Sequence, residues 1–477
     1  MKRRFIVMMA VLLAGAANAE QLALVGATVH DGTGGAAIED GVILVDGKRI
    51  TCVGARAECE PAEAAETIDL GGMHITPGLV DGHVHYSQTG WLDGRPDSRI
   101  GTNHYDYEAL QASLRANPAR WDRAYLCSGV TAVYDVGGLP WTLDLADAAA
   151  ADALRPHRRA AGPLITHYEP VFGVLSAQGQ DSFLPMDSDE AAVASVERLV
   201  DLGAAAIKVW YLEPPEGQQE TLDARLALIG RAAREAGLPL IVHATELRNA
   251  KAALRAGATM LVHSVEDQLV DEAFIELLRE NDAFYAPTLI VGANWRRAVA
   301  SVLLGIDAPR LDDPNGCVDE RTKQVIADAD SLGSGRALPR AALARLYAGL
   351  EGAGAARQIA AINLERVHAA GVTVVTSTDA GNPLTLHGPS IYAEMEAMEA
   401  AGIAPSAILT MSTRNGAAAM GRLEDFGTLE AGKLADLVVL EDNPSESASA
   451  YRSITHVMRA GRMSPVSVYA APDEASQ

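Results

Sequence analysis

Two histidines one residue apart, His83 and His85, follow an apolar run that begins at Ile75. On an extended strand, side chains at positions i and i+2 point to the same face. Two imidazoles on one face can bind a single metal ion, and imidazole is a good zinc ligand. The pair therefore predicts part of a metal site if other segments supply further ligands.

Four more residues of ligand type lie in or shortly after apolar, strand-like runs: Lys208, His243, His263 and Asp379. A lone histidine beside an apolar run is usually structural. Four histidines and an aspartate at the same end of successive strands are much harder to explain in that way. The sequence therefore predicts a metal centre.

The elements that would position these residues alternate between strand and helix. Eight apolar runs are strand-like, near Val80 and at 131–134, 164–166, 206–210, 240–243, 260–263, 284–286 and 372–376. Alanine-rich amphipathic stretches, such as 189–202 and 222–236, separate several of them. This alternation predicts an α/β fold, a TIM-like (β/α)8 barrel, whose active site lies at the C-terminal ends of the strands.

The barrel is predicted to span residues 79–425, with a helix-rich insertion at about 291–360 that would cap the site. Short β-type runs, separated by Gly and Asp, occur at both ends of the chain. They predict one small β-sandwich built from residues 20–78 and 426–477 together.

Residues 1–19 have the pattern of a cleaved export signal. Three basic residues precede an apolar run at 5–17 that is too short to span a bilayer, and a small-x-small site predicts cleavage after Ala19. No other stretch is long and apolar enough to span, so we expect a periplasmic or secreted protein. The net charge of −23 argues against nucleic acid as a partner, because an acidic surface repels phosphates.

The four cysteines fit an oxidising compartment loosely. Cys52 and Cys59 are close enough in sequence to close a small loop. Cys127 and Cys317 are far apart in sequence, and we expect Cys127 to be buried and unpaired. There is no CxxC spacing, so a cysteine metal cluster is not indicated.

The chain resembles the metal-dependent amidohydrolase superfamily over nearly its whole length after the signal. The resemblance rests on residues 77–85, His243, His263, Thr378-Asp379 and residues 427–440. It implies a barrel with a one- or two-metal hydrolytic site. In the two-metal members, which include prolidase-like dipeptidases, a lysine on the fourth strand reacts with CO2 and becomes a carbamate.

Lys208 matches that lysine, and its carbamate would be an anionic, bidentate group able to link two cations. The alternative is a lysine that reaches solvent from a strand end, but an unpaired buried ammonium is costly, which favours the carbamate. The resemblance then implies two divalent ions, most simply zinc. One is held by His83, His85 and Asp379, the other by His243 and His263, and carbamylated Lys208 links them.

A competing signal is the His-x-x-Glu spacing of His243 and Glu246. One-metal deaminases and imidazolone-type cyclic-amide hydrolases of the superfamily use such a glutamate to shuttle protons. Glu246 also opens a helical stretch, where the helix dipole favours a carboxylate, and we favour that role. An unmodified Lys208 would strengthen the ring-chemistry alternative.

The predicted activity is hydrolysis of an amide bond in a small molecule, a dipeptide or an N-acyl amino acid, with Asp379 as the catalytic proton carrier. Lactone or phosphotriester hydrolysis, and assembly into a homo-oligomer, stay open. A metal-binding scaffold without catalysis is the alternative from another class, and the complete ligand set with Asp379 argues against it. Four residues are candidate substrate contacts: Tyr211, His167, His387 and Glu246.

Overall fold

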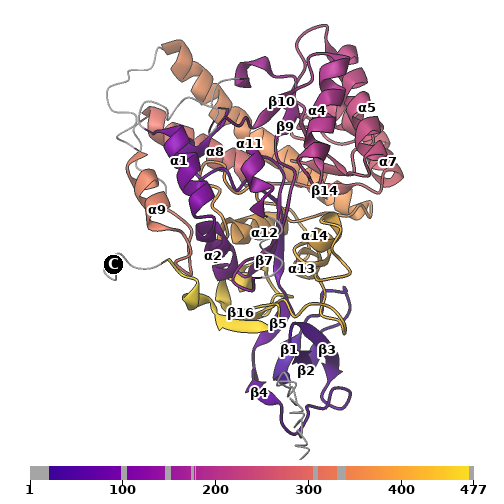
Figure 1. Ribbon diagram of the computed structural model, residues 1–477, viewed down its shortest axis with the longest axis vertical. Helices are drawn as coiled ribbons and strands as arrows, with labels where there is room; N and C mark the ends of the chain where they lie inside the picture. Colours follow the sequence, from indigo (N-terminus) through magenta and orange to yellow (C-terminus); the bar gives the residue numbers. More distant parts are fainter. Residues whose placement is uncertain are drawn as a thin grey trace, which may run out of the picture.

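The computed structural model describes residues 21–97, 105–145, 152–172, 177, 179–304, 310–329 and 340–471, without the side chains of 304 and 340–353. The signal predicted at 1–19 lies outside the described residues. Figure 1 shows a small β unit at one end of the molecule and a larger α/β unit next to it. Among the described residues, no helix is both long enough and apolar enough to cross a membrane.

The small unit is one eight-stranded sheet to which both chain ends contribute. Its strands are β1 (Leu22–Val29), β2 (Ile38–Asp46), β3 (Arg49–Ala55), β4 (Glu66–Asp69), β5 (His74–Pro77), β15 (Leu437–Leu440), β16 (Ile454–Arg459) and β17 (Arg462–Pro465). The ends meet where β5 pairs antiparallel with β15, from Pro77 opposite Leu437 to His74 opposite Leu440. Hydrogen bonds thus join all eight strands in a single sheet, where the sequence predicted a sandwich.

The larger unit contains two parallel sheets. One has the order β6-β7-β8, with β6 (Leu79–Val84), β7 (Val130–Asp135) and β8 (His157–Ala160). The other has the order β10-β9-β11-β12-β13-β14. Its strands are β9 (Leu164–Thr166), β10 (Phe183–Pro185), β11 (Ile207–Trp210), β12 (Leu240–His243), β13 (Met260–Val262) and β14 (Phe284–Ala286). The predicted parallel α/β arrangement is confirmed.

Backbone hydrogen bonds connect the two parallel sheets at two places. At one of them the Ala205 N–H donates to the Ala160 carbonyl at 2.8 Å, which links the edge strand β8 to the start of β11, an inner strand of the other sheet. At the other place, residues 373–376 lie between the edge strands β14 and β6. There the Tyr285 N–H donates to Thr373 and the Gly82 N–H donates to Thr376, each at 3.0 Å. The C-terminal ends of the strands are thereby brought around one common site.

Helices surround these strands (Figure 1). They are α1 (Tyr107–Ala116), α2 (Ala119–Cys127), α4 (Asp189–Asp201), α5 (Gln219–Glu235), α6 (Leu247–Arg255), α7 (Glu272–Glu280), α8 (Val291–Leu304), α9 (Glu320–Ala327), α11 (Arg340–Ala369), α12 (Ser390–Ala400), α13 (Pro405–Met411) and α14 (Arg414–Ala419). In α4 the Ser188 side chain accepts a hydrogen bond from the Ala191 N–H, and Ala192, Val196 and Leu199 form the buried face. The buried face follows the 3.6-residue period of the amphipathic helix that the sequence predicted for this stretch.

The predicted insertion contains α8, α9 and the first part of α11. Its apolar side chains Ala298, Val302 and Ile326 pack in one cluster with Trp91 and Leu386, from segments that follow β6 and Asp379. The prediction for Cys127 is wrong, because this buried cysteine forms a disulfide with Cys317 of the insertion. A second disulfide joins Cys52 and Cys59. A pairing across 190 residues leaves no local signal in the sequence.

The two disulfides should differ in their effect on stability, because they close loops of very different length. In a loop-entropy treatment, the pair Cys127–Cys317, with a sequence separation of 190, contributes about 5 kcal/mol to the free energy of unfolding. The pair Cys52–Cys59, with a separation of 7, contributes about 2 kcal/mol. We expect the double variant Cys127→Ala/Cys317→Ala to lose more stability in chemical denaturation than Cys52→Ala/Cys59→Ala, and equal losses would contradict this.

Candidate metal centre

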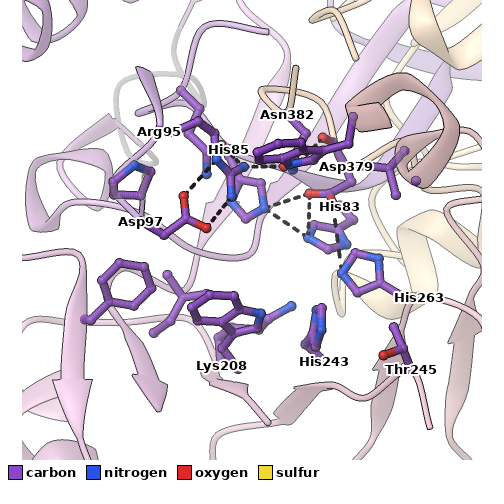
Figure 2. Close-up of a pocket in the computed structure, with 18 of the residues that line it drawn as sticks. His83, His85, Arg95, Asp97, Lys208, His243, Thr245, His263, Asp379 and Asn382 are labelled. Carbon is purple, nitrogen blue, oxygen red and sulfur yellow. Dashed lines mark hydrogen bonds and ion pairs between the residues drawn. The ribbon is translucent and has the colours of Figure 1, made fainter. Parts of the chain in front are cut away.

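His83 and His85 stand at the C-terminal end of β6, and backbone pairing brings Asp379 to them. The Asp379 N–H donates to the His83 carbonyl and the His85 N–H donates to the Ala380 carbonyl, both at 2.8 Å. The Asp379 carboxylate consequently faces both rings, with Oδ1 3.3 Å from His83 Nε2 and 2.8 Å from His85 Nε2. Figure 2 shows these three side chains converging.

The other predicted ligands face the same point from neighbouring strands (Figure 2). His243 ends β12 and His263 follows β13, and their ring centroids lie 4.4 Å apart. His263 is also 5.1 Å from His83 between ring centroids, and its Nε2 is 3.9 Å from Asp379 Oδ2. Lys208 lies in β11 with its side chain buried in the same cavity. The structure thus gathers all six residues that the sequence predicted.

The backbone is strained at two of these positions. His263 has φ of 73° and Asp379 has φ of 62°, a left-handed conformation that residues other than glycine seldom adopt. Such strain costs about 1–3 kcal/mol and persists only where the surroundings enforce it, often at functional sites. Here the side chains of both residues point into one cluster, which is consistent with a functional reason.

Burial and neighbouring positive charge keep three histidines of this cluster, His83, His243 and His263, neutral. Burial lowers the pKa of His83 and His263 well below the ordinary value, and it lowers the pKa of His243 to about 3; the positive charge of Lys208 acts in the same direction. A neutral imidazole carries one bare nitrogen that can bind a metal. The His85 Nδ1 lies 2.6 Å from the Gly137 carbonyl, so Nδ1 carries a proton and Nε2 is the nitrogen that faces Asp379.

This donor set fits a divalent metal ion. Nε2 of His85 lies 2.8 Å from Oδ1 of Asp379, and both side chains are buried. Ligand atoms of His83, His263 and Asp379 all lie within 4.8 Å of one another. Neutral imidazoles and a carboxylate that converge in this way are typical ligands of zinc and related metals.

Two buried carboxyl groups hold the ligands in position by accepting hydrogen bonds from the backbone at or near them. Asp81 accepts hydrogen bonds from the backbone N–H groups of His83 at 3.3 Å and Thr378 at 3.0 Å, and from the Thr378 hydroxyl at 2.5 Å. Burial raises the pKa of Asp81 to about 7. Its carboxyl group therefore ties β6 to the segment that carries Asp379. An acid two residues before the first histidine of an apolar strand is a signal that sequence reasoning could have used.

Glu394 of α12 positions His263 indirectly, by holding the segment that contains Thr288. Its buried carboxyl group accepts hydrogen bonds from the N–H groups of Leu289 at 2.8 Å and Ile290 at 3.1 Å. The neighbouring Thr288 hydroxyl lies 2.7 Å from His263 Nδ1. Burial raises the pKa of Glu394 to about 8. Nothing in the sequence around Glu394 pointed to this role.

The metal ligands lie in a cavity of about 480 Å³. One part of its wall is apolar and aromatic: Leu164, Phe183, Trp210, Val291 and Trp295. The charged part comprises Arg95, Asp97, Glu266 and Arg296. Trp210 is the neighbour of His243, with ring centroids 6.1 Å apart, so apolar substrate groups would lie directly beside the metal ligands.

The four candidate substrate contacts are not among the residues that line this cavity. The Tyr211 hydroxyl donates to Asp223 at 2.6 Å, and the His167 ring lies against the Tyr211 ring at 5.5 Å. His387 is buried between the Tyr125 hydroxyl at 2.8 Å and the Gln88 carbonyl at 3.0 Å. These placements give no support to a direct contact with substrate.

Glu246 is the fourth of them, and its carboxylate is also occupied outside the cavity. It accepts hydrogen bonds from the Thr245 hydroxyl at 3.1 Å and from the Asn249 amide at 3.0 Å. The residue stands at the N-cap of α6, with an extended backbone. Its position matches the helix-terminus role that the sequence favoured.

Comparisons with known proteins agree with this geometry. Residues 74–464 match the Amidohydrolase family. An imidazolonepropionase of Methylobacterium nodulans is 26% identical over 86% of this chain and 90% of its own length. One of Pseudomonas putida is 40% identical, but over only 20% of this chain and 24% of that protein.

Solved structures share the fold. A Xaa-Pro dipeptidase with bound methionine in the active site superposes with a TM-score of 0.69 at 21% identity, over 94% of this chain and all of that one. Molinate hydrolase superposes with a TM-score of 0.66 at 23% identity, over 96% of this chain and 99% of that one.

Asp81 offers a test of how the centre is held together. The variant Asp81→Ala removes the acceptor for the N–H groups of His83 and Thr378 and for the Thr378 hydroxyl. We therefore expect about a 10- to 100-fold loss of metal affinity, measured in competition with a chelator. The matched control is Asp122→Ala, a buried acid that contacts Arg158 and Tyr86 and no metal ligand. Comparable metal loss in both variants would show only general destabilisation and would contradict the assignment.

Proposed function

The chain belongs to the amidohydrolase family, whose members are hydrolases of carbon–nitrogen bonds, and we propose that it cleaves the amide bond of a dipeptide or an N-acyl amino acid. The observation that carries this proposal is Lys208, which is buried in one cavity with four histidines and Asp379. The full-length likeness to a Xaa-Pro dipeptidase supports the same substrate class.

Two divalent metal ions, most simply zinc, fit the residues present. His83, His85 and Asp379 would hold one ion, and His243 and His263 would hold the other. Burial lowers the pKa of Lys208 to about 7. In a substantial share of the molecules its side chain is therefore an uncharged, nucleophilic amine at neutral pH. That amine can add to CO2, and the resulting carbamate would link both ions. When bound, such ions lower the pKa of a water molecule and polarise a carbonyl group.

The protein's own residues supply positioning and proton transfer. Trp210, Phe183 and Leu164 form an apolar wall that would hold an apolar part of the substrate and exclude bulk water. Water adds to the amide carbon, and Asp379 accepts its proton. As the carbon–nitrogen bond breaks, Asp379 passes a proton to the leaving nitrogen, so the products are a carboxylic acid and an amine.

We also infer export and a closed barrel. The two disulfides support export, because stable disulfides are typical of oxidising compartments and rare in the cytosol.

The backbone bonds at Ala205, Tyr285 and Gly82 form an uninterrupted circuit through eight strand segments, which supports a closed (β/α)8 barrel.

Hydrolysis of a cyclic amide such as an imidazolone is the second candidate function. The match to an imidazolonepropionase over 90% of that protein's length favours it. In this alternative Glu246 would shuttle the proton. Its carboxylate instead accepts hydrogen bonds from Thr245 and Asn249, and Glu246 is not among the residues that line the cavity. We therefore place linear amides first.

A substrate panel tests the proposed function. It contains dipeptides, N-acyl amino acids, an imidazolone, a lactone and a phosphotriester, each followed by chromatography after incubation with metal-loaded protein. We expect a linear amide to give the highest kcat/KM. Preferred cleavage of the imidazolone, lactone or phosphotriester would overturn the assignment, and metal-loaded protein that cleaves none of them would favour a binding scaffold.

Asp379 separates metal binding from catalysis. The variant Asp379→Asn keeps an oxygen ligand and all four histidines, so we expect it to retain much of its metal. Because the amide cannot carry the proton, kcat should fall by about 10²- to 10⁴-fold. Metal content by elemental analysis and kcat should be measured on the same preparation. A variant with near-normal turnover would remove Asp379 from the proton-transfer role.

A further inference from the structure

Arg296 is a cationic side chain that lines the catalytic cavity and has no hydrogen-bonding partner among the described residues. It lies in α8, and it shares the wall with Val291, Gly292 and Trp295 of the same helix. Among the residues that the structure describes, no carboxylate lies within ion-pair distance of its guanidinium. An arginine with five free donors facing a substrate cavity is suited to bind an anionic group of the substrate.

The other arginine of the cavity, Arg95, is already occupied. Its Nε and Nη2 donate to the two oxygens of Asp97 at 2.9 and 2.7 Å, which is the bidentate arrangement that a substrate carboxylate would need. Its Nη1 donates to the Gln88 amide oxygen at 2.8 Å and to Asn382. Arg95 is therefore a structural part of the wall, and it leaves Arg296 as the cavity's available guanidinium.

The Arg296 guanidinium lies against Gly292, one turn earlier in α8. A Cβ atom added to Gly292 would lie 3.4 Å from Arg296 Nη2 and 3.7 Å from Nη1, which is ordinary van der Waals contact, so an alanine would also fit there. Gly292 and Arg296 both line the cavity, so this contact places the guanidinium at the cavity wall.

Glu266 lines the same cavity as Arg296, and the charge of Arg296 acts on its carboxyl group. Burial raises the pKa of Glu266, and the positive charge of Arg296 opposes that rise, although the two groups form no ion pair. Glu266 follows His263 by three residues on the same loop. The field of Arg296 therefore reaches the side of the cavity where His243 and His263 stand.

We propose that Arg296 binds the carboxylate of the substrate and so restricts the enzyme to amides of α-amino acids that have a free carboxyl group. This inference rests on the proposed function, because dipeptides and N-acyl amino acids are the amides that present such a carboxylate beside the scissile bond. The planar guanidinium can donate two parallel hydrogen bonds to it, while the aromatic wall takes the apolar side chain.

The test compares an acid with its amide. N-acetyl-L-phenylalanine and N-acetyl-L-phenylalanine amide are offered to the wild-type protein, to Arg296→Met and to Arg297→Met. Arg297 is the exposed neighbour in α8 that does not line the cavity, so it controls for loss of a charge from this helix. Release of the acetyl group gives kcat and KM, and calorimetry gives the affinity for each compound independently of turnover.

We expect Arg296→Met to raise KM and Kd for the acid by about 10- to 100-fold, with little change in kcat, and to leave both values for the amide unchanged. Arg297→Met should match the wild type. Equal losses for acid and amide, no loss for either, or a wild type that does not bind the acid would overturn the role of Arg296. Binding of the acid that depends on Arg296, without cleavage of any amide, would instead refute the proposed function alone.

Discussion

The pairing of β6 with the segment that carries Asp379 is the contact on which the rest of the site depends. Two backbone hydrogen bonds, from Asp379 to His83 and from His85 to Ala380, fix the register of a segment near residue 380 against one near residue 84. Asp81 secures this register, because its carboxyl group accepts hydrogen bonds from the N–H group of His83 in β6 and from that of Thr378 in the facing segment. A slip of one residue would move Asp379 out of the position where its carboxylate faces the histidines, because both of these backbone hydrogen bonds would have to change partners.

Burial of so many ionisable groups in one cavity is the second constraint. Histidines in water would be partly charged near neutral pH, but burial and mutual repulsion keep His83, His243 and His263 neutral. The same desolvation lowers the pKa of Lys208 to about 7, which gives this lysine an amine character that a surface lysine does not have. A set of neutral nitrogens around one carboxylate is the state in which metal ions bind, so the fold prepares the site before any ion arrives.

The sequence predicted the parts of the site that depend on local periodicity. His83, His243 and Asp379 end apolar runs, and strand ends meet in a parallel α/β fold, so their convergence followed from spacing alone. Lys208 and Trp210 lie two residues apart in β11, and the alternation of a strand indicates that Trp210 shares the Lys208 face. Tyr211, the predicted substrate contact next to it, instead donates a hydrogen bond to Asp223. Residues whose position depends on distant packing were beyond prediction: the wall residue Arg296 on α8, the support from Glu394, and the pairing of Cys127 with a cysteine 190 residues away.

We propose that a carbamate on Lys208 would link two metal ions. A crystal structure of the metal-loaded protein, with anomalous diffraction recorded at the absorption edge of the metal, tests it most directly. We expect two anomalous peaks, one among His83, His85 and Asp379 and one at His243 and His263, with additional planar density on the Lys208 amine between them. A single peak beside an unmodified lysine would contradict it.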